Sequence, residues 1–152
     1  MNNILLTITL SISLISSLFS SPMDGIWKKY IYTDGISSNY IFDVEKDNKG
    51  RVWIGTQNGV TLIEGKLIQK FGSSKGLPAA NIIKVVSVND KIYAATSTKG
   101  IYILGKDGFF SKTSIVKGSS LSTMEKVGDK LFVSTNLENI LYDGDKVSFM
   151  GK

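Results

Sequence analysis

The chain has 152 residues, a formal net charge of +5 at pH 7, and neither histidine nor cysteine. Without these two residue types a Ser-His-Asp or Cys-His nucleophile, the usual zinc site and a histidine general base are excluded, and we expect no cofactor. Seventeen lysines but one arginine, Arg51, argue against nucleic-acid binding, because phosphates and base edges favour the bidentate guanidinium and the lysines are dispersed.

Residues 1–21 predict an export signal. Residues 4–19 carry no charge, small residues before Pro22 offer a cleavage region, and the run is shorter than the roughly 20 residues of a membrane span. No Lys or Arg precedes this run, so an uncleaved membrane anchor is the alternative and the only membrane contact that we expect. The absence of cysteine, and hence of disulfides, fits an exported protein of a bacterial periplasm or cell surface.

Residues 22–152 suffice for one domain, and a motif recurs in them at a period of about forty residues. An aromatic strand end runs into a threonine at Trp53-Ile54-Gly55-Thr56, Tyr93-Ala94-Ala95-Thr96 and Phe132-Val133-Ser134-Thr135. A small sheet in a unit of this length buries its faces only by stacking on neighbouring sheets. The repeat therefore predicts an all-β chain that forms a partial β-propeller.

Short β-branched and aromatic runs, bounded by Gly, Asn, Asp and Ser, predict three four-stranded antiparallel blades at about residues 33–71, 72–113 and 114–149, with no helix. The expected strands are residues 40–45, 51–55, 60–63 and 67–71 in the first blade, 82–88, 91–95, 100–104 and 109–112 in the second, and 121–127, 130–134, 139–142 and 146–149 in the third. A further strand, Ile26 to Tyr32, is expected ahead of the first blade.

The residues between the expected first and second strands of each blade are typical of hairpin turns. Asp47-Asn48-Lys49-Gly50 suits a type I turn followed by a left-handed glycine, and Asn89-Asp90 and Gly128-Asp129 suit two-residue turns. The acidic residues before Gly50 could suggest a calcium loop, but the glycine comes two positions too late and no acidic residue closes the loop. We therefore predict structural turns and no metal site.

The first unit contains Asp34-Gly35 with Asn39, the Asp47 to Gly50 turn, Trp53 to Thr56, and Asn58-Gly59-Val60. In these segments it resembles the two-component regulator propeller repeat. The second unit keeps Gly76-Leu77-Pro78 with Asn81, whereas the third, which begins with Lys117-Gly118-Ser119-Ser120, is more altered. The resemblance implies an exported sensor region of hybrid histidine kinases or related surface proteins, which detect carbohydrates or other ligands. No part of this chain resembles the kinase core of such a protein.

In an antiparallel blade, the loop that leads into the first strand and the turn between the second and third strands lie on the same face of the disc. Polar side chains on that face are the candidates for a ligand site, namely Asn39, Gln57, Asn58, Asn81 and Asn136. The alternative is that these side chains hydrogen-bond their own backbone in turns.

The recurring aromatics Trp53, Tyr93 and Phe132 suggest carbohydrate stacking at first sight. Because they occupy the same strand position in every blade, we predict instead that they pack between adjacent sheets. Trp27 is the exception because it does not recur in the other blades. It lies on the expected leading strand, where we expect a neighbouring sheet to cover it.

The count of blades leaves the ring open. Three blades are fewer than the usual minimum of about four, and exposed sheet edges invite pairing with another chain. The chain is expected to be the beginning of a longer protein, an open arc that assembles with copies of itself, or a partial propeller that caps its own ends.

The expected function is binding of a ligand or partner by an exported, non-enzymatic propeller segment. One alternative is a propeller lyase or hydrolase that uses carboxylates, for which Asp34, Asp43 and Asp47 are the residues to mutate. The other is an assembly scaffold that pairs through its open edges.

Overall fold

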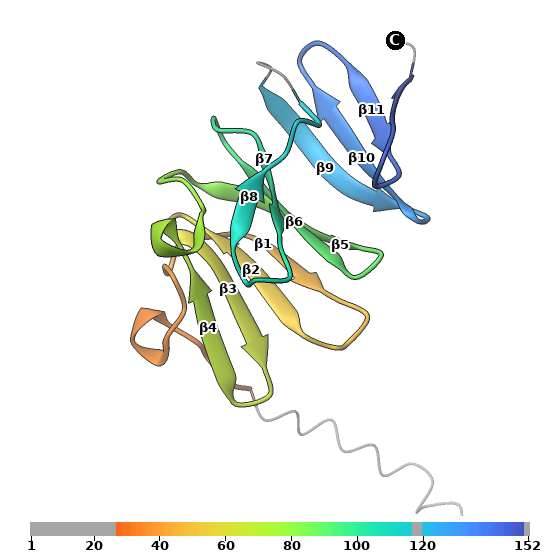
Figure 1. Ribbon diagram of the computed structural model, residues 1–152. Coiled ribbons are helices and arrows are strands. Elements are labelled where there is room, and N and C mark those ends of the chain that lie inside the picture. The colour runs from red at the N-terminus through yellow and green to blue at the C-terminus, as the bar shows by residue number, and fades with distance from the viewer. Residues whose placement is uncertain (1–26, 117–119, 151–152) are drawn as a thin grey trace, which may run out of the picture.

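The computed structural model describes residues 27–116 and 120–150, and this part of the chain forms three four-stranded antiparallel sheets in chain order (Figure 1). Blade 1 contains β1 (Ile41–Lys46), β2 (Val52–Thr56), β3 (Gly59–Glu64) and β4 (Leu67–Phe71). Blade 2 contains β5 (Ile82–Val88), β6 (Lys91–Thr96), β7 (Ile101–Leu104) and β8 (Phe110–Lys112). Blade 3 contains β9 (Leu121–Val127), β10 (Lys130–Thr135), β11 (Asn139–Tyr142) and β12 (Val147–Met150).

The predicted all-β partial propeller with three four-stranded blades is confirmed. Local turn chemistry accounts for the accuracy of the strand assignment. Gly50 has φ 77° after the first hairpin, and Asn89 and Asp90 have φ 50° and 60° in the second. These backbone conformations are the ones that a two-residue hairpin and a left-handed glycine require.

Two short 3₁₀ turns were not predicted, η1 at Tyr32–Asp34 and η2 at Ser73–Lys75. Each lies in the loop that leads into a blade and ends at a glycine, Gly35 with φ 109° and Gly76 with φ 87°. A three-residue turn has no hydrophobic period long enough to register in a sequence pattern, so only the left-handed glycine marks it.

The leading strand expected at Ile26 to Tyr32 is wrong within the described residues. From Trp27 the chain is irregular until η1 begins, and the Trp27 side chain is 96% exposed. A strand needs a neighbour to hydrogen-bond its backbone and a surface for its side chains. No strand of the described part pairs with this segment, so propensity alone does not produce a strand.

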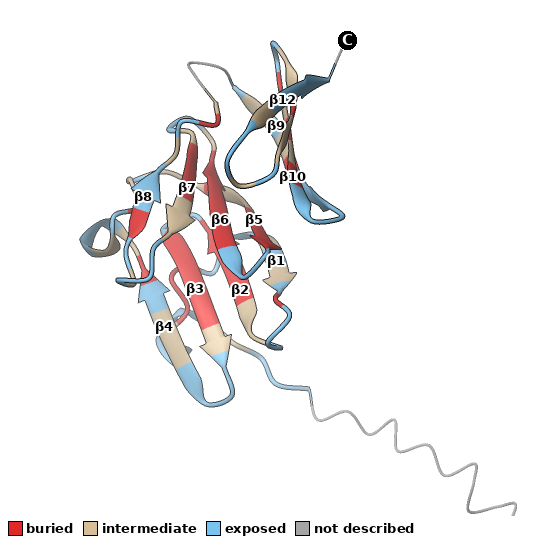
Figure 2. Cartoon of the chain, turned by 45° about the vertical axis from the view of Figure 1, so that its right-hand side comes forward, coloured by how far each residue is buried: buried red, intermediate tan, exposed pale blue. Residues whose placement is uncertain are grey.

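The core lies between the blades, where buried strands face one another (Figure 2). Trp53 is 1% exposed in the junction of blades 1 and 2, and Tyr93 is 2% exposed in the junction of blades 2 and 3. Both aromatics pack between sheets, as predicted. Phe132 is only half-buried, because it lies on the face of blade 3 that points away from blade 2, beyond which the described part of the chain has no further sheet.

The expected export signal at residues 1–21 and most of the loop that begins at Lys117 lie outside the described residues. Within the described ranges, no helix has the length and apolar character needed to cross a membrane.

Candidate ligand-binding site

The same backbone hydrogen bond ties two loops together at one end of each blade. The residue after β2, Gln57, donates its N–H to the carbonyl of Tyr40 (3.0 Å). The equivalent bonds run from Ser97 to Asn81 (3.0 Å) and from Asn136 to Ser120 (3.1 Å). The loop that leads into each blade and the turn between its middle strands therefore lie side by side.

The recurring threonine builds the middle turn. In blade 1 the Thr56 hydroxyl donates to the carbonyl of Gly59 (2.9 Å) and accepts the N–H of Asn58 (3.2 Å). Thr96 bonds the Gly100 carbonyl (2.8 Å) and the Lys99 N–H (2.9 Å) in the same way, and Thr135 does so with Glu138 (both 3.0 Å). These buried hydroxyls hold the turn and are not available to a ligand.

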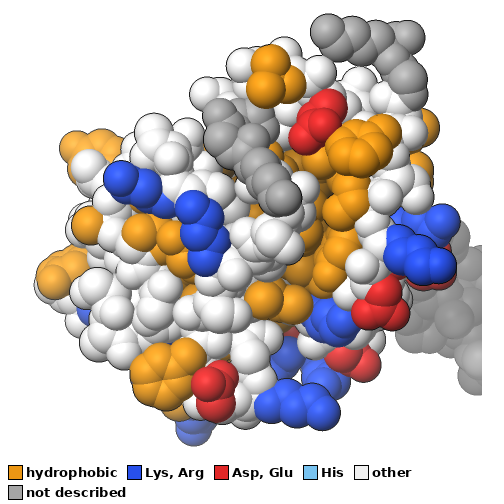
Figure 3. Space-filling model, turned by 45° about the horizontal axis from the view of Figure 1, so that its top comes forward, with side chains coloured by type: hydrophobic (Ala, Val, Ile, Leu, Met, Phe, Trp, Pro, Cys, Tyr) orange, Lys and Arg blue, Asp and Glu red, His pale blue; other side chains and the backbone are white. Residues whose placement is uncertain are grey.

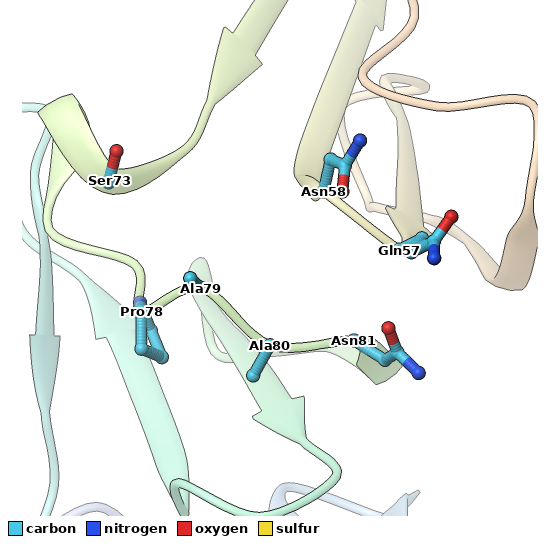
Figure 4. Close-up of a pocket in the computed structure, with 7 residues that line it drawn as sticks. All are labelled: Gln57, Asn58, Ser73, Pro78, Ala79, Ala80 and Asn81. Carbon is cyan, nitrogen blue, oxygen red and sulfur yellow. The ribbon is translucent and has the colours of Figure 1, made fainter.

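A polar depression of about 370 Å³ opens where blades 1 and 2 meet at this end (Figure 4). Gln57 and Asn58 come from the turn between β2 and β3, and Ser73 comes from η2. The segment that leads into β5 supplies the rest of the lining, which is Pro78, Ala79, Ala80 and Asn81. In this view the amides of Gln57 and Asn81 extend to the same side.

Three of the five predicted site residues, Gln57, Asn58 and Asn81, line this depression. Asn39 and Asn136 do not. The side-chain oxygen of Asn39 accepts the N–H of Tyr32 at 2.7 Å, and that of Asn136 accepts the N–H of Ser120 at 2.9 Å. These two amides serve the local backbone, which was the alternative role for such residues.

The amide groups of Gln57, Asn58 and Asn81 have no hydrogen-bond partner within the described residues. Each free amide offers both donors and an acceptor. Among the described residues, no charged side chain belongs to the lining. The arrangement is therefore suited to a neutral ligand that both donates and accepts hydrogen bonds.

Sequence reasoning did not include Ser73, Pro78, Ala79 and Ala80 in the site. Pro78 belongs to a recognised motif, but its position in a wall of the depression depends on how blade 2 sits against blade 1. Small residues such as Ala79 and Ala80 carry no chemical signal of their own, because they contribute space rather than a functional group.

The three carboxylates considered for catalysis have structural partners. Asp34 accepts the N–H of Ile31 (2.9 Å) and Asp43 accepts the N–H of Val85 (2.8 Å). Asp47 is buried beneath its turn and accepts from the Trp53 indole (2.9 Å) and from Nε of Arg51 (2.7 Å). Its burial raises the pKa of this carboxyl, but the bonds from Trp53, Arg51 and the turn backbone outweigh burial and bring the pKa below its ordinary value.

A second, larger depression lies at the opposite end of the junction of blades 1 and 2, beside the hairpin turns that follow β1 and β5. Basic side chains contribute to its lining, namely Lys49, Arg51, Lys91 and Lys106. Seen from the side that carries blade 3, the surface instead has a band of apolar side chains among scattered charges (Figure 3). Among the described residues no group of three or more Asp, Glu, His or Cys side chains is placed to hold a metal ion.

Three four-stranded sheets that stack in chain order define a partial β-propeller. Residues 35–58, in the first part of blade 1, match the model of the family described as the two component regulator propeller. The match includes Gln57 and Asn58 from the depression, together with Asp47 and Trp53.

A solved structure, the extracellular domain of a protein described as a hybrid two component system from B. thetaiotaomicron, is similar to this chain with a TM-score of 0.62. The two are 15% identical over 82% of this chain, so the likeness shows the fold. This chain covers 18% of the length of that one. No curated protein matches the sequence.

Proposed function

We propose that this chain is an exported, non-enzymatic sensor segment that binds a small neutral ligand, of which a carbohydrate is the best fit. The location is supported by the uncharged N-terminal run and by the extracellular position of the structurally similar domain. The binding role is supported by the depression between blades 1 and 2, whose amides are unpaired and whose lining is uncharged as far as the described residues go.

The single observation that carries the proposal is that Gln57, Asn58 and Asn81, which come from two blades, line one depression. Its volume of about 370 Å³ lies in the lower part of the range of small-ligand sites, roughly 300–1,000 Å³. A sugar hydroxyl both donates and accepts, so amides match it on both counts. Because residues of both blades would hold the ligand, the affinity for it would change with any change in the junction between them.

The enzyme alternative lacks a comparable arrangement. A carboxylate pair for glycoside hydrolysis has to flank the bond to be broken, and within the described part of the chain no Asp or Glu lines the depression. Mutation of Asp43 or Asp47 is therefore expected to lower the stability of the fold and not to remove a catalytic group.

The proposal is tested by adding neutral mono- and oligosaccharides to the protein and following the side-chain amide signals by NMR. We expect the signals of Gln57, Asn58 and Asn81 to shift together in a saturable way. Asn81→Ala is expected to weaken binding about tenfold, as loss of a hydrogen-bonding group in a binding site typically does.

The matched control is Asn48→Ala, because Asn48 is an exposed amide at the opposite end that bonds Asp90 at 2.9 Å. This variant is expected to bind sugars as the unmodified chain does. Saturating sugars that leave all three amide signals unmoved, or that bind equally well to Asn81→Ala, would contradict the proposed site.

A further inference from the structure

The second, larger depression between blades 1 and 2 has the opposite chemistry to the one lined by amides. Its volume is about 650 Å³, within the range of small-ligand sites, roughly 300–1,000 Å³. Three hairpins supply its charged residues. The β1–β2 hairpin supplies Lys49 and Arg51, the β5–β6 hairpin supplies Asp90 and Lys91, and the β7–β8 hairpin supplies Lys106. Among the described residues, basic residues therefore outnumber acidic ones in this basic depression.

Arg51, the only arginine of the chain, is held in place from one side. Its Nε donates to the carboxylate of Asp47 at 2.7 Å, and its guanidinium lies 5.2 Å from the centroid of the Trp53 ring. The side chain is nonetheless 23% exposed. The terminal nitrogens carry the remaining N–H donors, which have no partner within the described residues. A guanidinium fixed in this way binds a planar oxyanion through both terminal nitrogens at little cost in conformational entropy.

The ammonium of Lys106 is the second cation of the basic depression. Lys106 is exposed in the turn between β7 and β8, and it forms no ion pair with any described residue. Lys49 is partly neutralised, because its Nζ lies 3.9 Å from the carboxylate of Asp90. That carboxylate also accepts from Nδ2 of Asn48 at 2.9 Å. Arg51 and Lys106 are therefore the cations with the most unused binding capacity.

Two other polar residues of the lining turn toward blade 3. Nδ2 of Asn89 donates to the carbonyl of Asp129 at 2.8 Å. Nζ of Lys91 lies 3.3 Å from the position that a Cβ on Gly144 would take. Because Gly144 lies between β11 and β12 of blade 3, neither polar group is directed at a ligand in the basic depression.

The apolar part of the lining comes from blade 2. It consists of Ile92, Ile103 and Leu104, of which Leu104 is half-buried against the core of the junction. An inorganic anion would leave this surface in contact with water, whereas the carbon skeleton of an organic anion covers it, which is favourable. The depression is therefore better suited to an organic anion than to an inorganic one.

We propose that the basic depression binds a small organic carboxylate, with Arg51 as its anchor. The terminal nitrogens of Arg51 donate to the carboxylate oxygens, because the planar end of a guanidinium matches a carboxylate. The ammonium groups of Lys106 and Lys49 add attraction, and the apolar residues of blade 2 contact the carbon skeleton. The ligand thus contacts both blades, at the end opposite to the proposed carbohydrate site, and neither site depends on the other.

The test is titration of the chain with citrate, a tricarboxylate, followed by NMR and calorimetry. The salt concentration is about 0.15 M, at which attraction to the overall charge of the chain is largely screened. We expect saturable binding that shifts the Nε signal of Arg51 and the backbone amide signals of Lys49 and Lys106. The side-chain amide signals of Gln57 and Asn81 should not move. Galactose, a neutral sugar, should leave the Arg51 signal unchanged.

Lys106→Glu is expected to weaken citrate binding about tenfold, as loss of a hydrogen bond to a charged group does. The matched control is Lys66→Glu. Lys66 is exposed and follows a glycine in the turn between the third and fourth strands of blade 1, as Lys106 does in blade 2, but it does not line the depression. Because both variants change the net charge equally, a loss that reflects only the overall charge would be the same in both.

Arg51→Lys keeps the positive charge but removes the planar pair of donors, so it should also weaken citrate binding about tenfold. Thermal unfolding verifies that this variant is folded, since Arg51 also bonds Asp47. Lys106→Glu tests the site without disturbing that bond. The proposal would be overturned by the absence of saturable citrate binding, by citrate shifts confined to other parts of the chain, or by equal losses in Lys66→Glu and Lys106→Glu.

Discussion

The residues that recur most regularly act on the local backbone. Thr56, Thr96 and Thr135 each close a tight turn with one hydroxyl, which explains why a threonine ends the second strand of every blade. Asp47 has a similar role at the other end of blade 1, where it accepts from the N–H groups of Lys49 (2.9 Å) and Arg51 (3.0 Å) and from the Trp53 indole. One carboxylate thus joins a hairpin turn to the core.

Asp47→Asn is expected to lower the free energy of unfolding by about 3 kcal/mol at neutral pH, as loss of one partner of a buried ion pair does. It should also change the pH dependence. The folded-state pKa of Asp47 lies below its ordinary value of 3.8, so the unfolded chain binds the proton more tightly. The stabilisation is complete above this value and is lost as the pH falls through the folded-state pKa.

Urea unfolding at a series of acidic pH values measures this effect. The unmodified chain should lose stability more steeply than Asp47→Asn as the pH falls below about 4. Asp129→Asn is the control, because Asp129 is exposed and its side chain accepts no bond within the described residues. If the free energy of unfolding fell equally steeply at acidic pH for the unmodified chain and for Asp47→Asn, the stabilising role assigned to the Asp47 carboxylate would be contradicted.

At the scale of elements, the loop ahead of each blade is a structural component of the junction. Leu77 follows η2 and enters the core shared by blades 1 and 2, while Gly76 lies directly against the backbone of Phe110 at the start of β8. The equivalent Gly35 faces only the side chain of Ile68, at 3.3 Å from the position of a Cβ. The same turn is thus tightly enclosed in one blade and loosely covered in the other.

Gly76→Ala should therefore destabilise the chain more than Gly35→Ala does. Both glycines have positive φ, so each substitution costs about 1 kcal/mol or more of backbone strain. Gly76→Ala also forces a Cβ onto the carbonyl of Phe110, which adds roughly 2 kcal/mol, as overpacking typically does. Chemical denaturation of the two variants gives the difference directly. Equal losses would show that the leading loop of blade 2 can move away freely.

For the molecule as a whole, stability depends on how many neighbours each blade has. Blade 2 is covered on both faces, and the interior of β6 is buried throughout. Blades 1 and 3 each have one neighbouring sheet within the described part of the chain. In a repeat structure of this kind the stability of a unit is largely the sum of its neighbour contacts.

Amide hydrogen exchange should reflect this order. The central amides of β6 are expected to exchange about tenfold more slowly, or more, than those of the equivalent strand β10, because protection follows the local free energy of opening. The edge strand β12 should exchange fastest of the strands in blade 3. Equal protection of β6 and β10 would mean that the three blades open as one unit.

Much of the architecture is readable from particular residues. The Asp47 to Gly50 turn, Asn89-Asp90 and the three aromatic-to-threonine motifs place the strands closely, because turn chemistry and strand periodicity act over a few neighbouring residues. The position of Trp53 and Tyr93 between sheets follows in the same way. The segment from Trp27 was predicted incorrectly, since its strand propensity is realised only beside a partner strand.

The sequence by itself therefore determined the three blades, their strands and the end of the disc at which the loops gather, because these depend on local backbone preferences repeated along the chain. Only the tertiary structure decided which amides remain unpaired. Asn39 and Asn136 bond their own loops, whereas Gln57, Asn58 and Asn81 border the depression. This outcome depends on how one sheet packs against the next, and contacts between residues some forty positions apart leave no signal in any short stretch of sequence.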